Sequence, residues 1–119
     1  MNVPERFELF VLSEGVKKVT SIPETKVLNC TTFKIQREDH TLGNLLCRQL
    51  QTMSGPTVTY AGYRMPHPLE PAFELRVQTD GTINPRAALQ QAITGLQAQL
   101  STLDDRVRVE IRRCRTTKK

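Results

Sequence analysis

Few side chains in this sequence belong to types that carry out acid–base or nucleophilic chemistry. The only histidines are His40 and His67, and the carboxylates Glu38 and Asp39 precede the first of them. Neither histidine stands in a pattern that supplies both a nucleophile and an orienting carboxylate. The carboxylates are explained more simply by a helix that begins here, because acidic groups are stabilised at a helix N-terminus. We therefore interpret both histidines as turn residues and expect no catalytic site.

The residues that could bind a metal or a phosphate are equally sparse. Cys30, Cys47 and Cys114 are widely separated and form no Cys-x-x-Cys pair, so the pattern indicates neither a zinc site nor a disulfide framework. Gly43 stands alone, without the further glycines of a phosphate-binding loop. We expect no cofactor and no metal. Gly43 is better explained by close packing of another element against a helical turn, which offsets about 1 kcal/mol of lost helix propensity.

The composition predicts one soluble globular domain. The chain has 119 residues, of which 38% are hydrophobic and 24% charged. The longest apolar run, residues 9–12, is too short for a membrane span or a signal peptide, so an intracellular protein is expected. Much of the net charge of +5 lies at the C-terminal end. We expect residues 1–111 to form the domain and residues 112–119 to be a basic, flexible tail.

A helix is expected to begin near residues 39–41, with either Asp39 or Thr41 as its N-cap. It should end near Met53, because Ser54, Gly55 and Pro56 cannot continue it. At about 100° per residue, its apolar positions cover roughly 200° of the circumference. A helix that lies on one sheet needs little more than about 100°, so this helix is expected to have two buried sides. The apolar positions are Leu42, Gly43, Leu45, Leu46, Cys47, Leu50 and Met53, interrupted by Gln49.

Short strands are expected on both sides of that helix. Alternating or β-rich patterns predict strands over residues 16–22, 30–37, 57–65 and 73–78, the last two forming a hairpin. Residues 6–12 are either another short strand or a segment laid on the surface.

A second helix is expected from Pro85, capped by Asn84, to about Arg112. Its apolar residues recur with a period of 3.5, as in helix-on-helix packing. They form a seam that consists of Leu89, Ile93, Leu96, Leu100, Leu103 and Val107. Residues 106–112 alternate and could instead form a strand, although we favour the helix because nothing breaks it. Such a helix is about 42 Å long, whereas strands of six to eight residues reach about 20 to 26 Å. Its distal apolar positions should overhang the sheet and require a partner; they are Leu103, Val107 and Ile111.

Residues 38–46 resemble a known motif. The segment His40-Thr41-Leu42-Gly43-Asn44-Leu45-Leu46, preceded by Glu38-Asp39, is similar to the α-motif of RNA polymerase subunits. This motif is shared by the bacterial α subunit and the small α-like subunits of archaeal and eukaryotic polymerases. Ordered flanking matches extend the resemblance over nearly the whole chain. They are Met1-Asn2-x-Pro4, Phe7-Glu8-x-Phe10, Ala61-Gly62-Tyr63, His67-Pro68-Leu69, Leu75 to Thr79, and Asn84-Pro85.

The resemblance implies an α+β fold with two layers, in which an antiparallel sheet of about four strands carries two helices on one face. It implies a non-catalytic subunit of a DNA-directed RNA polymerase in the nucleus. Such a subunit pairs obligately with a larger α-like subunit, and the pair is the platform for the two large catalytic subunits. The family's zinc lies on the larger partner. Carried over to this sequence, the dimer surface consists of Leu42, Gly43, Leu45, Leu46, Gln49, Leu89, Ile93, Leu96, Leu100, Leu103 and Val107. For Leu42 and Leu89 a place in the chain's own core is an equally good interpretation, whereas the overhang favours the interface for Leu100, Leu103 and Val107.

Two alternatives remain beside this interpretation. The resemblance favours the polymerase II member of the family over the relative shared by polymerases I and III. A basic α+β nucleic-acid-binding module is the rival class, because bases stack on exposed aromatic residues of some sheets. Only Tyr60 and Tyr63 could serve in that way, and no recognition motif surrounds them. We expect no membrane contact and no sequence-specific contact with nucleic acid.

Overall fold

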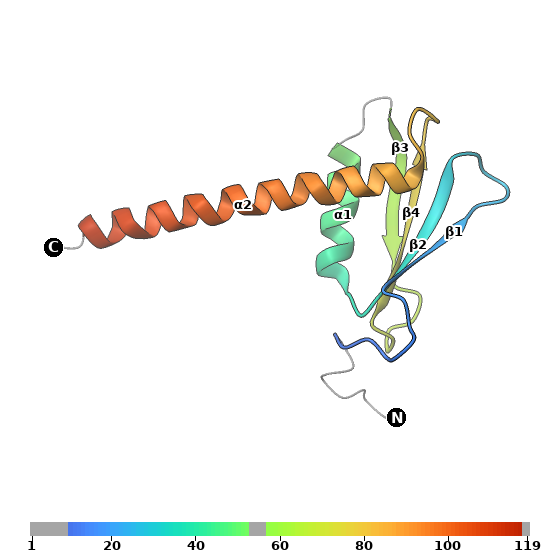
Figure 1. Cartoon of the computed structure of the whole chain (residues 1–119), viewed down its shortest axis with the longest axis horizontal. Coiled ribbons are helices and arrows are strands. Elements are labelled where there is room, and N and C mark those ends of the chain that lie inside the picture. Colours follow the sequence, from blue (N-terminus) through green and yellow to red (C-terminus); the bar gives the residue numbers. More distant parts are fainter. Residues whose placement is uncertain (1–9, 53–56, 118–119) are drawn as a thin grey trace.

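The computed structural model describes residues 10–52 and 57–117 of the chain, which form one antiparallel sheet and two helices (Figure 1). The strands pair in the order β1-β2-β4-β3, and every neighbouring pair is antiparallel. This confirms the expected fold class. In chain order the elements are β1 (Val19–Pro23), β2 (Cys30–Gln36), α1 (His40–Thr52), β3 (Val58–Arg64), β4 (Ala72–Thr79) and α2 (Pro85–Thr117).

The central strands β2 and β4 supply most of the core. Phe33 and Ile35 of β2 pair with Leu75 and Phe73 of β4, and all four side chains are buried beneath the helices. Successive residues of a strand point to opposite faces, so the intervening positions form a more polar, open face. Val77 completes the buried row on β4. The alternation predicted from the sequence is therefore confirmed.

The first strand is an edge strand whose five residues are all exposed. It begins at Val19 rather than at Val16, and it includes Pro23, which the sequence analysis placed after the strand. Proline is tolerated here because an edge strand has a side that donates no hydrogen bond to a neighbour. Residues 10–12 form no strand, and residues 6–9 lie outside the described part of the chain.

Both helices lie on the same face of the sheet, α1 over β3 and β4, and α2 over β4 and β2 (Figure 1). Asp39 is the N-cap of α1, since its Oδ1 accepts the backbone N–H of Thr41 at 3.0 Å. This decides between the two predicted caps. Asn84 caps α2 as predicted, because its Oδ1 accepts the N–H of Ala87 at 2.7 Å.

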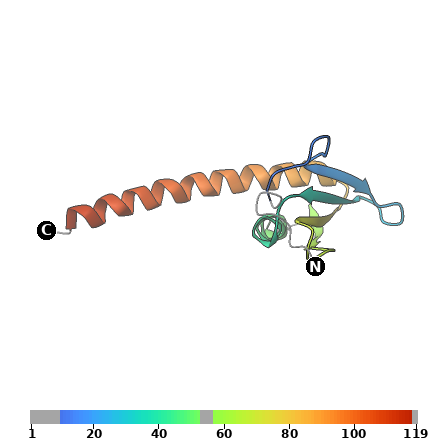
Figure 2. The ribbon, with the colours of Figure 1, turned by 90° about the horizontal axis from the view of Figure 1, so that it is seen from below.

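The second helix is much longer than the sheet is wide. Its 33 residues, which include 106–112, confirm the helical alternative and give a length of about 50 Å. Every residue from 97 to 117 is exposed, and Figure 2 shows this part of α2 extending beyond the sheet and α1. The helix also continues past Ile111, so residues 112–117 of the expected tail are helical. Neither described helix combines the length and apolarity that a membrane crossing requires.

Candidate functional site

The first turns of α2 are anchored in the core. Ala88 and Ala92 are completely buried, and Leu89 is almost so, because they face the sheet. On the neighbouring flank, the side-chain amide of Gln99 donates a hydrogen bond to Gln49 of α1 at 3.1 Å. The anchored part of the helix therefore fixes the direction in which the remainder projects.

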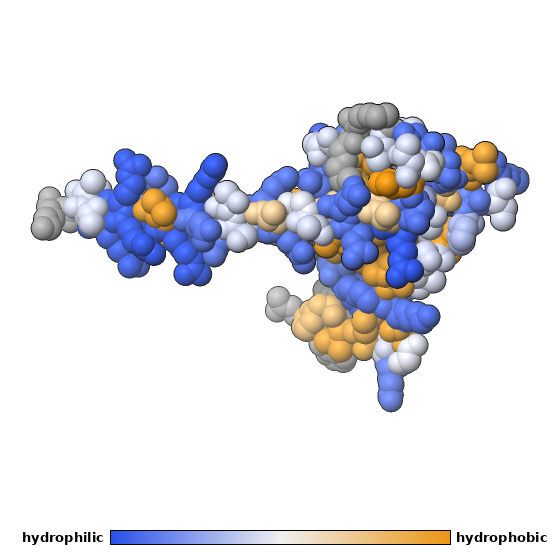
Figure 3. All heavy atoms as spheres, turned by 45° about the horizontal axis from the view of Figure 1, so that its top comes forward, coloured by the Kyte–Doolittle hydropathy of each residue, from blue (hydrophilic) through white to orange (hydrophobic). Residues whose placement is uncertain are grey.

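The projecting part of α2 carries an apolar seam that nothing in the described chain covers. Leu100, Leu103 and Val107 are 53%, 57% and 47% exposed, and Ile111 continues beside them. Figure 3 shows an apolar patch on this part of α2 between hydrophilic side chains. The expected overhang is thus confirmed. Large apolar side chains arranged in one stripe are typical of a surface that another protein covers.

Charged side chains border the seam along the last turns of α2. Asp104 accepts a hydrogen bond from Arg108 at 3.1 Å, and Glu110 accepts one from Arg113 at 3.1 Å. Such exposed pairs contribute only a few tenths of a kcal/mol each to helix stability. They keep the helix ordered and soluble while leaving the seam accessible.

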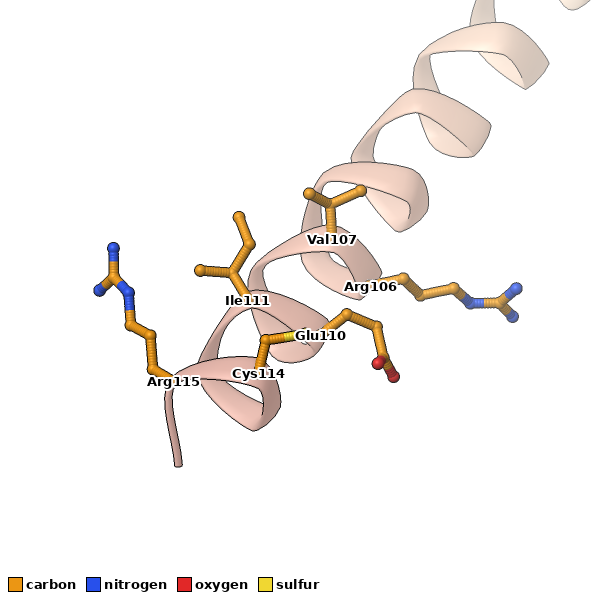
Figure 4. A pocket seen from close by; sticks show the side chains of 6 residues that line it. All are labelled: Arg106, Val107, Glu110, Ile111, Cys114 and Arg115. Carbon is orange, nitrogen blue, oxygen red and sulfur yellow. The ribbon is translucent and has the colours of Figure 1, made fainter. Parts of the chain in front are cut away.

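A shallow hollow of about 420 Å³ lies at the distal end of the seam, and all of its lining residues belong to α2 (Figure 4). Val107 and Ile111 form its apolar part, and Cys114 lies one turn further on. A ligand cavity normally encloses most of a small molecule's surface, whereas one convex helix offers a single wall. This hollow therefore fits the flank of a second helix better than a small molecule.

The structure divides the predicted dimer surface into three groups. Five of the eleven side chains are exposed, three are partly buried, and three lie in the chain's own core. The core members present little area to a partner, since only the edge of Leu89 that lines a groove beside β1 is still exposed, so the accessible surface is smaller than predicted. The exposed group is Leu45, Ile93, Leu100, Leu103 and Val107, the partly buried group is Leu42, Gln49 and Leu96, and the core group is Gly43, Leu46 and Leu89.

Gly43 has the close neighbour that its isolation predicted, but the neighbour belongs to the same chain. A Cβ added to Gly43 would lie 2.7 Å from Cδ2 of Tyr63 on β3. The Tyr63 ring is held in turn by a 3.0 Å hydrogen bond between its hydroxyl and Nδ1 of His40, and by an edge contact with Phe73. The motif residues His40 and Gly43 therefore join the start of α1 to the sheet. His40 is a hydrogen-bonding residue at the helix start, as expected.

A groove of about 610 Å³ between β1 and the first half of α2 was not foreseen from the sequence. Val19 of β1 forms one wall, and Leu89 and Ile93 of α2 form the other. Its rim carries the cations Lys17 and Arg86, and no acidic residue lines it. The groove exists because the two helices cover β2, β3 and β4, whereas β1 has no helix of its own. Sequence reasoning would have needed the strand order to find it.

The open face of the sheet offers little support for nucleic-acid binding. Tyr60 is on this face and is 52% exposed, but its side chain lies over Gly62 of the same strand. A Cβ added to Gly62 would be 2.6 Å from the Tyr60 hydroxyl. Tyr63 faces the helices and is packed against Gly43. Arg64 pairs with Glu74 at 3.4 Å, which offsets its charge. Neither tyrosine presents a free ring for base stacking.

The buried cysteines are packing residues of the core. Burial raises the pKa of the Cys47 thiol, which keeps it in the unreactive neutral form. Cys30 is also buried, and its sulfur accepts a hydrogen bond from Arg76 at 3.3 Å. Among the residues that the structure describes, no group of histidine, cysteine and carboxylate side chains could hold a metal ion.

The comparisons with known proteins identify the family of this chain. The model of the family described as "RNA polymerase Rpb3/Rpb11 dimerisation domain" matches residues 30–106. The chain belongs to this family. It is 44% identical over 105 residues to DNA-directed RNA polymerase II subunit rpb11 of Dictyostelium discoideum, covering 88% of this chain and 86% of that protein. It is 45% identical over 114 residues to the probable RPB11 subunit of Caenorhabditis elegans, covering 96% and 91%.

A solved structure supports the fold independently. DNA-directed RNA polymerase subunit L of Thermoplasma acidophilum matches 80% of this chain and 89% of its own, with a TM-score of 0.64 and 22% identity. The relatives and the family make this chain a small α-like subunit of the RNA polymerase II type, with a dimerisation domain rather than a catalytic one.

Proposed function

We propose that the projecting seam of α2, together with exposed Leu45 of α1, binds the larger α-like subunit of RNA polymerase II. The observation that carries this proposal is the exposure of Leu100, Leu103 and Val107 on a helix that is otherwise anchored in the core. The family dimerisation domain that matches residues 30–106 includes Leu100 and Leu103 and ends one residue before Val107. The pairing is obligate in this proposal, because the seam remains in water without a partner.

The heterodimer then acts as the platform on which the two large catalytic subunits assemble, in the nucleus. The rigid anchoring of α2 supports this role. A helix held in the core at one end presents its seam in a fixed direction, so little conformational entropy is lost when the partner binds. Leu42, Gln49 and Leu96 are partly buried and would complete the contact.

Co-expression with the larger α-like subunit tests the proposal, using a charge placed on the seam. Leu103→Glu would bury an unpaired carboxylate in the heterodimer, at a cost of several kcal/mol, but leaves it in water in the free chain. Val109→Glu is the matched control, because Val109 is 51% exposed on the same helix but stands off the seam. Leu103→Glu should abolish co-purification while the circular dichroism spectrum is unchanged, and Val109→Glu should co-purify normally.

Two results would contradict the proposal. One is co-purification of Leu103→Glu at wild-type yield. The other is equal loss of pairing in both variants, which would mean that charge anywhere on α2 disturbs the complex and that the seam has no special role.

A further inference from the structure

The apolar positions of α2 are spaced symmetrically along the helix. Their separations are four, three, four, three and four residues, so the pattern is the same in both directions from Ala98. We propose that the chain, when its larger partner is absent, pairs with a second copy of itself through antiparallel α2 helices in a register centred on Ala98. This homodimer uses the seam of the proposed heterodimer and would compete with it. The six positions are Leu89, Ile93, Leu96, Leu100, Leu103 and Val107.

The centred register places an apolar residue opposite every apolar residue. Leu96 of one copy faces Leu100 of the second copy, and Ile93 faces Leu103. Leu89 faces Val107, and the two-fold axis repeats each layer. In antiparallel helix pairs with a period of 3.5, alternate seam positions meet in this way. A two-fold pair of this kind is closed, so association stops at the dimer.

The groove beside β1 provides space for the incoming helix. The anchored half of the seam is not sealed, because Leu89 and Ile93 line the 610 Å³ groove that β1 leaves open. The opposite flank of α2 is occupied by α1 through the Gln49–Gln99 contact. The distal part of α2 from a second copy can therefore pack against the anchored part of the first copy's α2 only on the side that faces Val19. By symmetry each copy fills the groove of the other.

Charges at the two ends of the seam favour the same register. Arg86 precedes Leu89 by three residues and Glu110 follows Val107 by three, so each continues the seam by one position. In the register centred on Ala98, Arg86 of one copy faces Glu110 of the second copy, and the symmetric dimer contains this pair twice. Arg86 lies on the rim of the groove, where the other cation is Lys17. In the single chain Glu110 pairs with Arg113 through an exposed contact that is weak and exchangeable.

Cysteine cross-linking of the full-length chain tests the register. In a Cys114→Ser background, chains with Ile93→Cys and chains with Leu103→Cys are mixed and treated with a short thiol cross-linker. The mixed pair should link, because the two positions share a layer. Leu103→Cys alone should not link, since its two copies would lie ten residues apart, or about 15 Å along the helix axis. Self-linking of Leu103→Cys without mixed linking would establish a parallel pair and overturn the proposal.

A charge exchange tests the ends of the seam, with sedimentation equilibrium as the readout. Arg86→Glu and Glu110→Arg should each weaken the homodimer about tenfold, because like charges then face each other twice. The double variant restores the opposite-charge pairs and should return to within about threefold of wild type. A double variant that is as weak as the single variants would overturn the register.

This test is separate from that of the proposed function. A chain that stays monomeric at tens of micromolar would overturn the homodimer. Co-purification of the same chain with the larger α-like subunit would then leave the proposed heterodimer intact.

Discussion

Replacing Gly43 by alanine tests whether close packing at the start of α1 outweighs helix propensity. A glycine within a helix gives up about 1 kcal/mol relative to alanine, so the change at an open site would stabilise the chain. At Gly43 the new Cβ would lie 2.7 and 2.9 Å from two ring carbons of Tyr63. Ordinary carbon–carbon contacts are about 3.5 to 4.0 Å, so the ring must move by nearly 1 Å.

The Tyr63 ring has little freedom to move that far. Its hydroxyl is held by His40, and its edge packs against Phe73, which is completely buried. Overpacking of this kind costs about 1 to 3 kcal/mol. After the gain in propensity is subtracted, we expect Gly43→Ala to lower the free energy of unfolding by about 1 kcal/mol, and Gly43→Val by more.

Gly95 of α2 is the matched control. It is also a helical glycine, and an added Cβ would lie 2.6 Å from Nε2 of Gln49, which is the end of a flexible side chain. Because that amide can rotate away at the cost of only its exposed hydrogen bond to Gln99, Gly95→Ala should be neutral or stabilise the chain by up to about 1 kcal/mol. Urea unfolding followed by circular dichroism, at one fixed protein concentration for all variants, measures both changes.

The ring itself provides a second check. In a Tyr63→Leu background the ring is absent, so Gly43→Ala should become neutral or stabilising, whereas a Tyr63→Phe background should retain the loss. Stabilisation by Gly43→Ala equal to that by Gly95→Ala, in the wild-type background, would refute the packing argument. Because the contact is within the chain, the effect should appear in the stability of the subunit before it appears in pairing.

Three further predictions concern the C-terminal end of α2, the loop that precedes this helix, and the cysteines. Truncation after Ile111 should leave the yield of heterodimer unchanged, because the last turns are exposed and make no contact with the sheet; a loss of pairing would assign them a role. The pKa of Asp80 lies below its usual value because the hydroxyl and the backbone N–H of Thr82 donate to it. The ionised carboxylate therefore stabilises the fold at pH values above the unfolded pKa of Asp80, and this effect is lost as the pH falls through the folded pKa. Asp80→Asn should lower the free energy of unfolding at pH 7 but hardly change it at pH 2. Iodoacetamide should modify exposed Cys114 well before buried Cys47, as mass spectrometry would show.

The sequence predicted those features that depend on local patterns. Alternation identified β2 and β4, and the Asn84-Pro85 pair identified the start of α2. The overhang followed from length alone, since a helix rises 1.5 Å per residue whatever it packs against. These predictions needed no knowledge of which strand lies beside which.

Features that depend on the strand order were missed or misplaced. The groove beside β1 exists because β1 lies at the edge of the sheet, and no local pattern reports that position. The burial of Leu46 and Leu89 depends on how α1 and α2 share the central strands. The resemblance placed both on the dimer surface, with the core equally open for Leu89, because an apolar residue has the same pattern in a core as in an interface. The predicted contribution of Met53 lies outside the described residues.

The exposed part of α2 is helical before either of the proposed partners binds. Its 21 exposed residues, 97–117, gain little from the sheet, so the helix there is maintained by propensity and by pairs such as Asp104–Arg108. Each pair contributes only about 0.2 to 0.5 kcal/mol, and helices shorter than about 12 to 15 residues are marginal in water when isolated. Continuity with the anchored turns removes the cost of nucleation, so the seam is already helical when a partner arrives. A preformed seam with a symmetric spacing would suit an antiparallel helix of the same period, and in the two proposed complexes the charges at its ends would favour one partner over the other.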